Sequence, residues 1–420
     1  MGYIDVAASF ETLKDRTFRY KVYLNESCAV ELDEEPIHPI NKDALKIALQ
    51  IAIMVNSDIP EEIEVMRKTV LDGSNTSGFQ RTALVGMNGW IETSFGKVGI
   101  TNICLEEDAA QILKRDKKCV TYGLNRLGIP LVEIGTSPDI HEPEQAREVA
   151  EKIGMILRST GKVKRGIGTI REDLNISIKG GARCEIKGVQ KLNLIPKIVE
   201  LETKRQLALI KKRKRVSKDV RKALPNGKTE FMRPMPGASR LYPETDCPPI
   251  QITKEKIERI KKSIPELIIE KQERLIEEHD LNEEVAKHII QSERYKLFAK
   301  IFKCDKKLAI IFLTSPEAKK ISDSRIIELF EAIKGNQIPK EAFFDIVKQI
   351  INNPENIKAI IKKVLKKAIS DDDIRAEVKK IIKQKKGLSF GAYMGLVMKV
   401  FRGRADGKTI ARILKEELKD

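Results

Sequence analysis

The sequence predicts an α+β protein, in which an antiparallel-sheet domain is followed by an all-α helical domain and a small helical tail. The first observation is the alternation of apolar and polar residues between Thr82 and Leu105, the period of half-buried strands. The second is a change of composition after Pro249, where glycine becomes rare and Lys and Glu combine with Ile and Leu at helical spacing. At 420 residues the chain is too long for one ordinary core. We therefore expect three domains: residues 1–250, 251–358 and 359–420.

Three helices are expected in the first domain. Leu45 to Val55 is apolar on nearly every side, which predicts a buried helix, and a second short helix is expected over Pro60 to Lys68. The third extends from Glu142 to Ser159, where Pro143 is typical of a first helical position and Gly161 of a helix end.

Two hairpins are expected in the same domain. Asn88-Gly89 is a strong hairpin signal, and with Gly96 it divides the alternating stretch into three strands: 82–87, 90–94 and 98–105. The second hairpin turns at Gly180-Gly181, between strands at 174–178 and 182–187.

The charge balance suggests a polyanionic partner. Lys and Arg number 78 against 61 acidic residues, a net charge of +17, and the last sixty residues alone contain 17 basic and 8 acidic side chains. Such a basic end is typical of a chain that binds phosphates, although a lysine-rich solvated surface is an alternative. The six cysteines form no CxxC pair and no segment approaches 18 consecutive apolar residues, so we expect a soluble intracellular protein.

Three glutamates are the best candidates for a metal site. Glu106 and Glu107 follow an apolar segment, and Glu133 interrupts the strand-like run Ile129 to Ile134. A carboxylate within such a run is costly to bury unless a cation, a donor or water meets it, and Mg²⁺ prefers oxygen ligands. The alternative is that Glu106, Glu107 and Asp108 begin a helix, which is the commoner explanation on spacing alone.

Three other polar segments have two interpretations each. The loop Asp72 to Gly78 offers N–H groups and hydroxyls to an anion, but it lacks a Walker pattern and suits an ordinary turn. Arg171, Asp173 and Asn175 alternate along one strand, where they line a cleft or face solvent. The basic run 211–215 contacts phosphate or is a solvated surface.

Six long phrases in the first 250 residues go further: DEEP at 33–36, VMRKTVLDGSNTSGFQRT at 65–82, LEEDAA at 105–110, NRLGIPLVEIGTSPDI at 125–140, GTIREDLNISIKGGARCEIKGVQ at 168–190 and FMRPMPGASRLYPETD at 231–246. They resemble the GatB/GatE family of tRNA-dependent amidotransferase subunits, and its archaeal E branch more than its B branch. The last sixty residues, with GRAD at 403–406, resemble the tail domain of the same family.

The resemblance implies that the chain is part of an ATP-dependent carbon–nitrogen ligase of the cytoplasm. In this family, ATP phosphorylates the side-chain carboxylate of Glu-tRNA(Gln), and ammonia displaces the phosphate to give Gln-tRNA(Gln). The ammonia comes from glutamine or asparagine through a tunnel, and for the E branch it is made by an asparaginase-like, D-type amidotransferase subunit. The implied cofactors are ATP and Mg²⁺, the implied partners are Glu-tRNA(Gln) and the D-type subunit, and the implied assembly is a hetero-oligomer without a membrane.

The resemblance also implies roles for particular residues. By motif match, Glu106, Glu107 and Glu133 are the expected catalytic residues and magnesium ligands in a catalytic cradle formed by residues 1–250. Phosphoryl transfer relies mostly on positioning and charge neutralisation, which suits a metal held by carboxylates. The residues expected to contact ATP or substrate are Arg67, Lys68, Ser74, Ser77, Gln80, Arg171, Asp173 and Asn175. The basic tail is expected to bind the body of the tRNA.

Two departures from the family pattern raise an alternative. Family members begin with a strand carrying a Glu-x-His element, which does not occur among residues 1–32. Members of the E branch also carry an inserted domain resembling aspartyl-tRNA synthetase, for which the segment between Leu209 and Phe231 leaves no room. The alternative is therefore a catalytically incomplete, tRNA-binding scaffold fragment of the same family.

Overall fold

The computed structural model describes residues 5–420 except 165, 167, 238–239, 292–293, 336–337, 339–341, 353–356, 358, 361–370, 386, 402–406 and 419–420. The GRAD phrase at 403–406 therefore lies outside the described residues. The chain forms two compact units, Met1–Ile268 and Ile269–Asp420, and each is described by itself.

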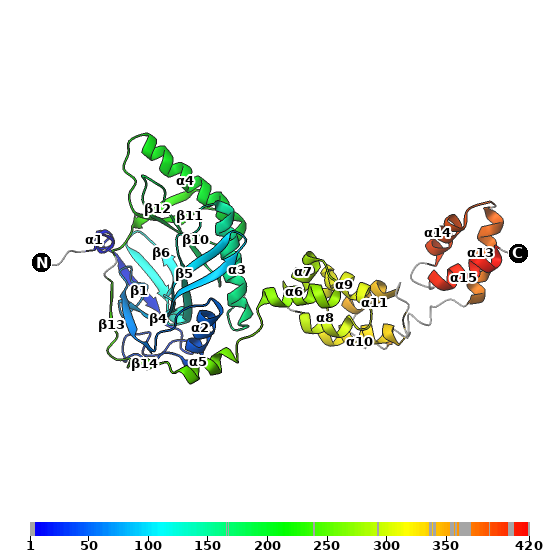
Figure 1. The fold of residues 1–420 in the computed structure, drawn as a ribbon, viewed down its shortest axis with the longest axis horizontal. Helices are drawn as coiled ribbons and strands as arrows, with labels where there is room; N and C mark the ends of the chain where they lie inside the picture. The colour runs from blue at the N-terminus through cyan, green and yellow to red at the C-terminus, as the bar shows by residue number, and fades with distance from the viewer. Residues whose placement is uncertain are drawn as a thin grey trace. The chain divides into compact units, whose positions relative to one another are not determined.

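The first unit is built on a five-stranded sheet, the main sheet, with strand order β13-β3-β4-β5-β8 (Figure 1). Its strands are β3 (Val65–Thr69), β4 (Phe79–Thr93), β5 (Gly96–Glu107), β8 (Pro130–Thr136) and β13 (Leu241–Pro243). All neighbouring pairs are antiparallel, as predicted. The register places Thr82 opposite Glu106 and Cys104 opposite Glu133, and so decides which side chains share a face.

The hairpin predicted at Asn88-Gly89 is wrong, because β4 continues through both residues and the chain turns just before Gly96. A Cβ at position 89 would lie 2.6 Å from the backbone oxygen of Val55. The N–H of Trp90 donates to that same oxygen at 2.8 Å. Glycine at this position thus permits the close approach of the segment that follows the first long helix.

Two of the three predicted helices are confirmed. The buried helix is α2 (Lys42–Met54), whose cap Asn41 accepts hydrogen bonds from two N–H groups of the first turn. The third is α3 (Pro143–Ser159), which begins with Pro143 and a capping box. The helix expected over 60–68 is wrong: this segment forms β2 (Glu62–Ile63) and β3, because its backbone pairs with β14 (Ile250–Gln251) and β4.

The main core lies between α2 and the main sheet, and α5 (Lys254–Lys261) contributes Ile260 to it. Its buried members are Leu45, Ala48, Leu49, Ala52, Val55, Ile63, Ala83, Val85, Ile91, Val98, Ile100, Ile103, Leu105, Val149, Ile252 and Ile260. Alternate residues of β4 and β5 fill this core, so the intervening residues face the other side of the sheet.

A second sheet, with order β12-β11-β10-β9, packs against α3 and α4 (Figure 1). Its elements are β9 (Glu172–Ile176), β10 (Cys184–Val189), α4 (Ile195–Lys211), β11 (Asp219–Ala223) and β12 (Thr229–Pro234). The hairpin predicted around Gly180-Gly181 is confirmed as β9 and β10. The remaining elements are α1 (Val6–Thr12) and a three-stranded sheet of β1 (Thr17–Lys21), β7 (Cys119–Gly123) and β6 (Gln111–Arg115).

The second unit is helical in its described residues, as predicted. Its α-helices are α6 (Ile268–His279), α7 (Glu283–Gln291), α8 (Tyr295–Ile301), α9 (Lys306–Leu313), α10 (Asp323–Lys334), α11 (Phe343–Asn352), α13 (Asp371–Gln384), α14 (Phe390–Val400) and α15 (Gly407–Glu417). Helices α6 to α11 share one apolar core, and α13 to α15 share another. Over the described part of the chain, no helix is both long enough and apolar enough to cross a membrane. The three-domain division stays a prediction.

Candidate functional site

The last two residues of β5 are Glu106 and Glu107, and the pleat directs their side chains to opposite faces of the main sheet. The alternative that they begin a helix is therefore wrong. Glu106 is only 5% exposed, and its Oε1 accepts hydrogen bonds from Lys68 Nζ at 3.0 Å and Thr82 Oγ1 at 3.3 Å. These donors come from β3 and β4, so the cross-strand register builds the contact.

Glu133 lies on the same face as Glu106. In β8 it stands opposite Cys104, which precedes Glu106 by two residues and so points to the same side. Its Oε2 is 3.7 Å from Lys68 Nζ, so a single ammonium contacts both carboxylates. We call this side of the sheet, defined by Lys68, Glu106 and Glu133, the carboxylate face. The side chain of Glu133 is 53% exposed, so the face is open to solvent there.

The two carboxylates and the lysine of the carboxylate face shift one another's pKa values. Partial burial and then the charge of Glu106 raise the pKa of Glu133 above its ordinary value, and Lys68 acts in the opposite direction. Burial lowers the pKa of Lys68, but the two glutamates outweigh it and raise this pKa above its usual value. The ammonium therefore stays charged at neutral pH.

Glu107 lies on the opposite face, in an ion pair with Arg81. On that face Arg67 binds Glu244 through two hydrogen bonds, Nε to Oε2 at 2.5 Å and Nη2 to Oε1 at 2.7 Å. The Glu244 side chain is fully buried. The fold thus brings neither Glu107 nor Arg67 to the carboxylate face, and their roles as metal ligand and nucleotide contact stay predictions.

The predicted anion loop is fastened to the end of β5. Gln80 Nε2 donates to the backbone oxygen of Glu107 at 2.6 Å, and the backbone oxygen of Ser74 accepts from the N–H of Ala110 at 2.9 Å. Ser77 Oγ donates to the backbone at the start of β4 at 3.4 Å. These contacts hold the loop beside the glutamates, and direct binding of nucleotide by Ser74, Ser77 and Gln80 stays a prediction.

The polar face of β9 and β10 adds a second lysine near the carboxylates. Asp173 Oδ2 accepts from Lys187 Nζ at 2.7 Å, and Lys187 is close enough to Glu133 for its charge to lower the pKa of that glutamate. Asn175 is exposed on β9, opposite Glu185, which also pairs with Lys187 at 2.6 Å. Asp173 is therefore linked to the carboxylate face through Lys187.

Sequence reasoning missed four residues that contact or lie near the predicted ones: Thr82, Asp108, Lys187 and Arg240. Asp108 is 8% exposed and accepts from Arg171 Nη2 at 3.2 Å. Arg240 lies close enough to Lys68 to lower the pKa of that lysine. All four occur in the phrases quoted above, but spacing along the chain does not reveal which strands pair.

The carboxylate face fits Mg²⁺ with two carboxylate ligands. Among the residues that the structure describes, no three His, Cys, Asp or Glu side chains converge as a metal site. Mg²⁺ is, however, usually bound by one or two carboxylates, with waters and phosphates in the remaining positions. Glu106 and Glu133 are two such carboxylates on one face, and their binding of Mg²⁺ stays a prediction.

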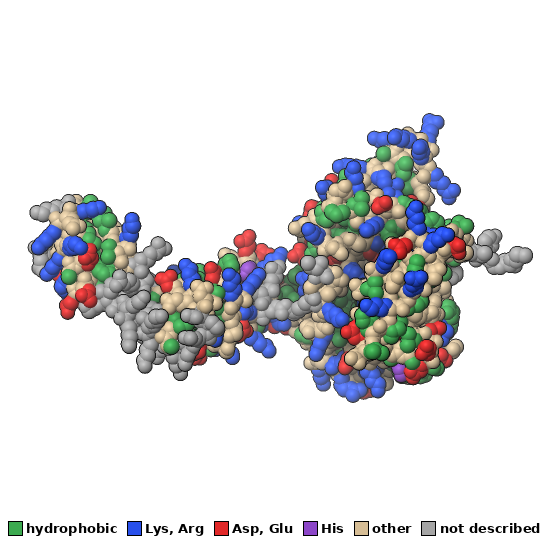
Figure 2. Space-filling view, turned by 180° about the vertical axis from the view of Figure 1, so that it is seen from behind, with side chains coloured by type: hydrophobic (Ala, Val, Ile, Leu, Met, Phe, Trp, Pro, Cys, Tyr) green, Lys and Arg blue, Asp and Glu red, His purple; other side chains and the backbone are tan. Residues whose placement is uncertain are grey.

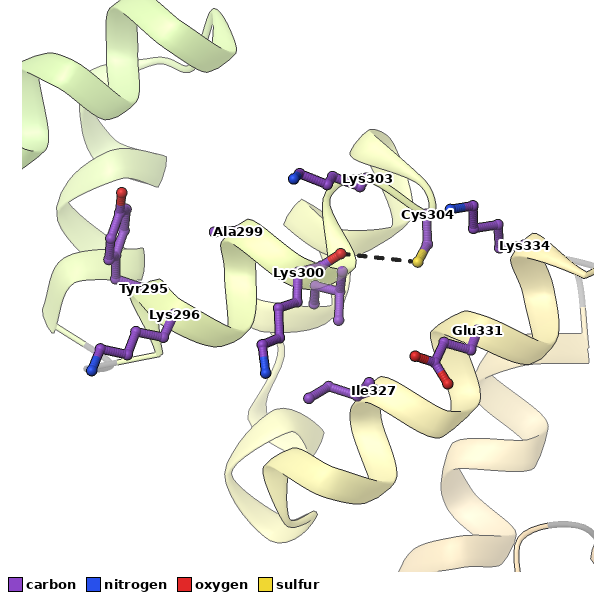
Figure 3. Close-up of a pocket in the computed structure, with 10 residues that line it drawn as sticks. Tyr295, Lys296, Ala299, Lys300, Lys303, Cys304, Ile327, Glu331 and Lys334 are labelled. Carbon is purple, nitrogen blue, oxygen red and sulfur yellow. Dashed lines mark hydrogen bonds between the residues drawn. The ribbon is translucent and has the colours of Figure 1, made fainter.

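Two further basic regions contain none of the residues of the carboxylate face. The run 211–215 begins at the last residue of α4 and is exposed at every residue. Figure 2 shows Lys and Arg side chains gathered at the end of the first unit where α4 ends. In the second unit, a hollow of about 690 Å³ between α8 and α10 is lined partly by lysines (Figure 3). These are Lys296, Lys300, Lys303 and Lys334. None of the predicted site residues lines this hollow.

Family comparisons match both units. Residues 20–258 match a model described as the GatB/GatE catalytic domain, and residues 313–418 match one described as a GatB domain. The first match contains every predicted site residue. The second spans the end of the helical core together with the described tail helices.

Curated relatives cover nearly the whole chain. All three described next are E-type subunits of glutamyl-tRNA(Gln) amidotransferase. That of Methanocaldococcus jannaschii is 35% identical over 578 aligned positions, which include 100% of this chain and 91% of the relative. The subunit of Thermococcus gammatolerans is 34% identical over 573 positions, which include 100% of this chain and 91% of the relative. The subunit of Pyrococcus horikoshii is 35% identical over 548 positions, which include 95% of this chain and 86% of the relative.

The alignments also show where the relatives are longer. Because each alignment exceeds 420 positions, the relatives contain internal stretches without a counterpart here. The matches nevertheless span both units of the fold and include every residue of the carboxylate face. The chain belongs to the GatB/GatE family, and archaeal E-type subunits of glutamyl-tRNA(Gln) amidotransferase are its curated relatives.

Proposed function

We propose that this chain is the activating subunit of a glutamyl-tRNA(Gln) amidotransferase and works in the cytoplasm. The γ-carboxylate of Glu-tRNA(Gln) attacks the γ-phosphorus of ATP and ADP leaves, which gives an acyl phosphate. Ammonia then attacks the acyl carbon and loses a proton, and phosphate departs to leave Gln-tRNA(Gln). The observation that carries the proposal is the pair Glu106 and Glu133 on one open face, bridged by Lys68. Membership of the GatB/GatE family supports the same reaction class.

Each residue of the carboxylate face has a defined task in this proposal. Glu106 and Glu133 hold Mg²⁺, which when bound neutralises charge on the phosphates of ATP. Thr82 fixes the Glu106 carboxylate through its hydroxyl, and Lys68 supplies a positive charge for the transferred phosphoryl group. Lys187, held by Asp173, lies near enough to add a second. Phosphoryl transfer requires such positioning and charge neutralisation more than covalent chemistry.

The proposal includes two partners. Ammonia comes from an asparaginase-like D-type subunit, the partner that the resemblance to the E branch implies; the E-type name of the relatives supports an assembly with other subunits. The tRNA is bound by the tail, which has its own core of α13 to α15 and a large share of the basic excess. A separately folded basic module suits recognition of a phosphate backbone.

The test is ATP hydrolysis by the full chain with Mg²⁺, ammonium and either Glu-tRNA(Gln) or uncharged tRNA(Gln). We expect phosphate release that depends on the charged tRNA. If tRNA binds but no charge-dependent hydrolysis occurs, even with the D-type subunit present, the scaffold alternative replaces the proposal. Mixing the chain with that partner also tests whether the internal stretches that the relatives have, and this chain lacks, are needed.

Deletion of residues 361–420 tests whether the tail binds the tRNA. We expect weaker tRNA binding and a flatter dependence of affinity on salt, because each lost phosphate contact reduces the slope of log K against log salt by about 0.7 to 0.9. The measurement is a filter-binding titration at several salt concentrations. A slope equal to that of the full chain would assign the tRNA contacts to another part of the protein.

A further inference from the structure

Lys68 holds the position between Glu106 and Glu133 that a bound cation would need. Its ammonium is 3.0 Å from Oε1 of Glu106 and 3.7 Å from Oε2 of Glu133, so it approaches both proposed metal ligands at once. Glu106 is only 5% exposed, and its other partner is the neutral hydroxyl of Thr82. Lys68 is thus a counter-ion shared by both carboxylates.

An ammonium and a divalent cation cannot both occupy this position, because like charges at contact distance repel strongly at the surface of a protein. The ammonium of Lys68 can move away from the two carboxylates, because it lies at the end of a flexible four-carbon chain with three rotatable donors. Its side chain is 27% exposed, so the ammonium can turn outward into the open part of the face. Thr82 would keep its hydrogen bond to Glu106 throughout.

We propose that Lys68 is an exchangeable counter-ion: it binds Glu106 and Glu133 in the metal-free protein, and leaves them for a phosphate of ATP once the two carboxylates take up Mg²⁺. The inference rests on the proposed function, since it assigns metal binding to these glutamates. In this exchange, Lys68 opposes metal binding in the free protein and supports nucleotide binding once Mg²⁺ is bound. A lysine that stays on the two carboxylates would not become more exposed when Mg²⁺ binds.

The first test measures metal affinity without nucleotide, in the full chain, with Mn²⁺ as an EPR-visible probe. Lys68→Met should tighten Mn²⁺ binding roughly tenfold and weaken ATP binding in the presence of metal, a coupling within the ordinary range. Lys68→Arg, which keeps the charge, should leave Mn²⁺ affinity close to that of the wild type. The control Lys97→Met removes the same charge from β5, where Lys97 stacks on Trp90, and should not change Mn²⁺ binding.

The second test uses the wild-type chain, in case Lys68→Met does not fold. Amine-reactive labelling followed by peptide mass spectrometry should show faster modification of Lys68 when Mg²⁺ is added, with Lys97 unchanged. Equal or weaker Mn²⁺ binding by Lys68→Met, or unchanged labelling of Lys68 at saturating Mg²⁺, would overturn the exchange but not the proposed function. If neither the wild type nor Lys68→Met binds Mn²⁺, the metal site itself is absent and both fail.

Discussion

Glu133→Gln should lower tRNA-dependent ATP hydrolysis at least about a hundredfold, because it removes one of two charges that hold the metal beside the phosphates. The fold should survive. The side chain is 53% exposed, and its raised pKa means that its ionised form is not stabilised by folding. Steady-state phosphate release with Glu-tRNA(Gln), together with thermal unfolding of the same preparation, measures both effects.

Glu107→Gln is the matched control for this prediction. It makes the same chemical change at the residue next to Glu106, whose side chain lies on the opposite face of the sheet, beside Arg81. We expect Mn²⁺ binding to persist in Glu107→Gln and to weaken strongly in Glu133→Gln and Glu106→Gln. Loss of Mn²⁺ binding in a folded Glu107→Gln protein would restore the three-carboxylate site suggested by the family motif, and full activity of Glu133→Gln would remove the two-carboxylate site.

Glu244→Gln should lower the free energy of unfolding of the first unit by about 3 kcal/mol, since it leaves the Arg67 guanidinium without its fully buried partner. The loss is moderated by Asp246, whose carboxylate is 3.6 Å from Arg67. Trp90, the single tryptophan, lies in β4 and reports on this unit during urea unfolding. Glu92→Gln changes an exposed carboxylate of the same strand and should have little effect.

The stability difference between the wild type and Glu244→Gln should depend on pH in a defined direction. Burial alone would raise the pKa of Glu244, but the hydrogen bonds from Arg67 outweigh it and hold the pKa below its ordinary value. The stabilisation is therefore complete above the unfolded-state pKa of about 4.3 and is lost as the pH falls through the lower folded-state value. The difference between wild type and Glu244→Gln should be constant near neutrality and shrink below about pH 4. A difference that stays constant in acid would show that the ion pair is not its cause.

Much of the fold could be predicted where local signals agree with tertiary packing. The helix α3 has a proline at its first position, a capping box and a glycine beyond its end, and all three act within a few residues. The hairpin of β9 and β10 was predicted for the same reason, from alternation on both sides of Gly180-Gly181. At Asn88-Gly89 the local signal predicted a turn that is not formed. There the close approach of the Val55 backbone, which is distant in the sequence, decides the structure.

The site could be predicted in part. Glu133 was recognised because a charged residue in an apolar run needs a partner, and its cross-strand neighbours supply one. The sequence did not reveal that Glu106 and Glu107 continue the strand and separate onto two faces. It also did not reveal that Lys68 lies between the two carboxylates, because that contact depends on the register of β3, β4, β5 and β8.

The central claim is that this chain uses its carboxylate face to make an acyl phosphate on tRNA-bound glutamate. The most direct measurement traces an oxygen atom from the γ-carboxylate of the glutamate into the released phosphate. Glu-tRNA(Gln) is prepared with ¹⁸O in the γ-carboxylate and incubated with the full chain, ATP, Mg²⁺ and ammonium, and the released phosphate is analysed by mass spectrometry. Because the carboxylate oxygen that attacks the γ-phosphorus leaves with the phosphate, we predict one ¹⁸O in each phosphate released with the wild type. With Glu133→Gln, we predict that labelled phosphate forms at least about a hundredfold more slowly. Phosphate released by the wild type without ¹⁸O would show that ATP is hydrolysed by water, and would contradict the account.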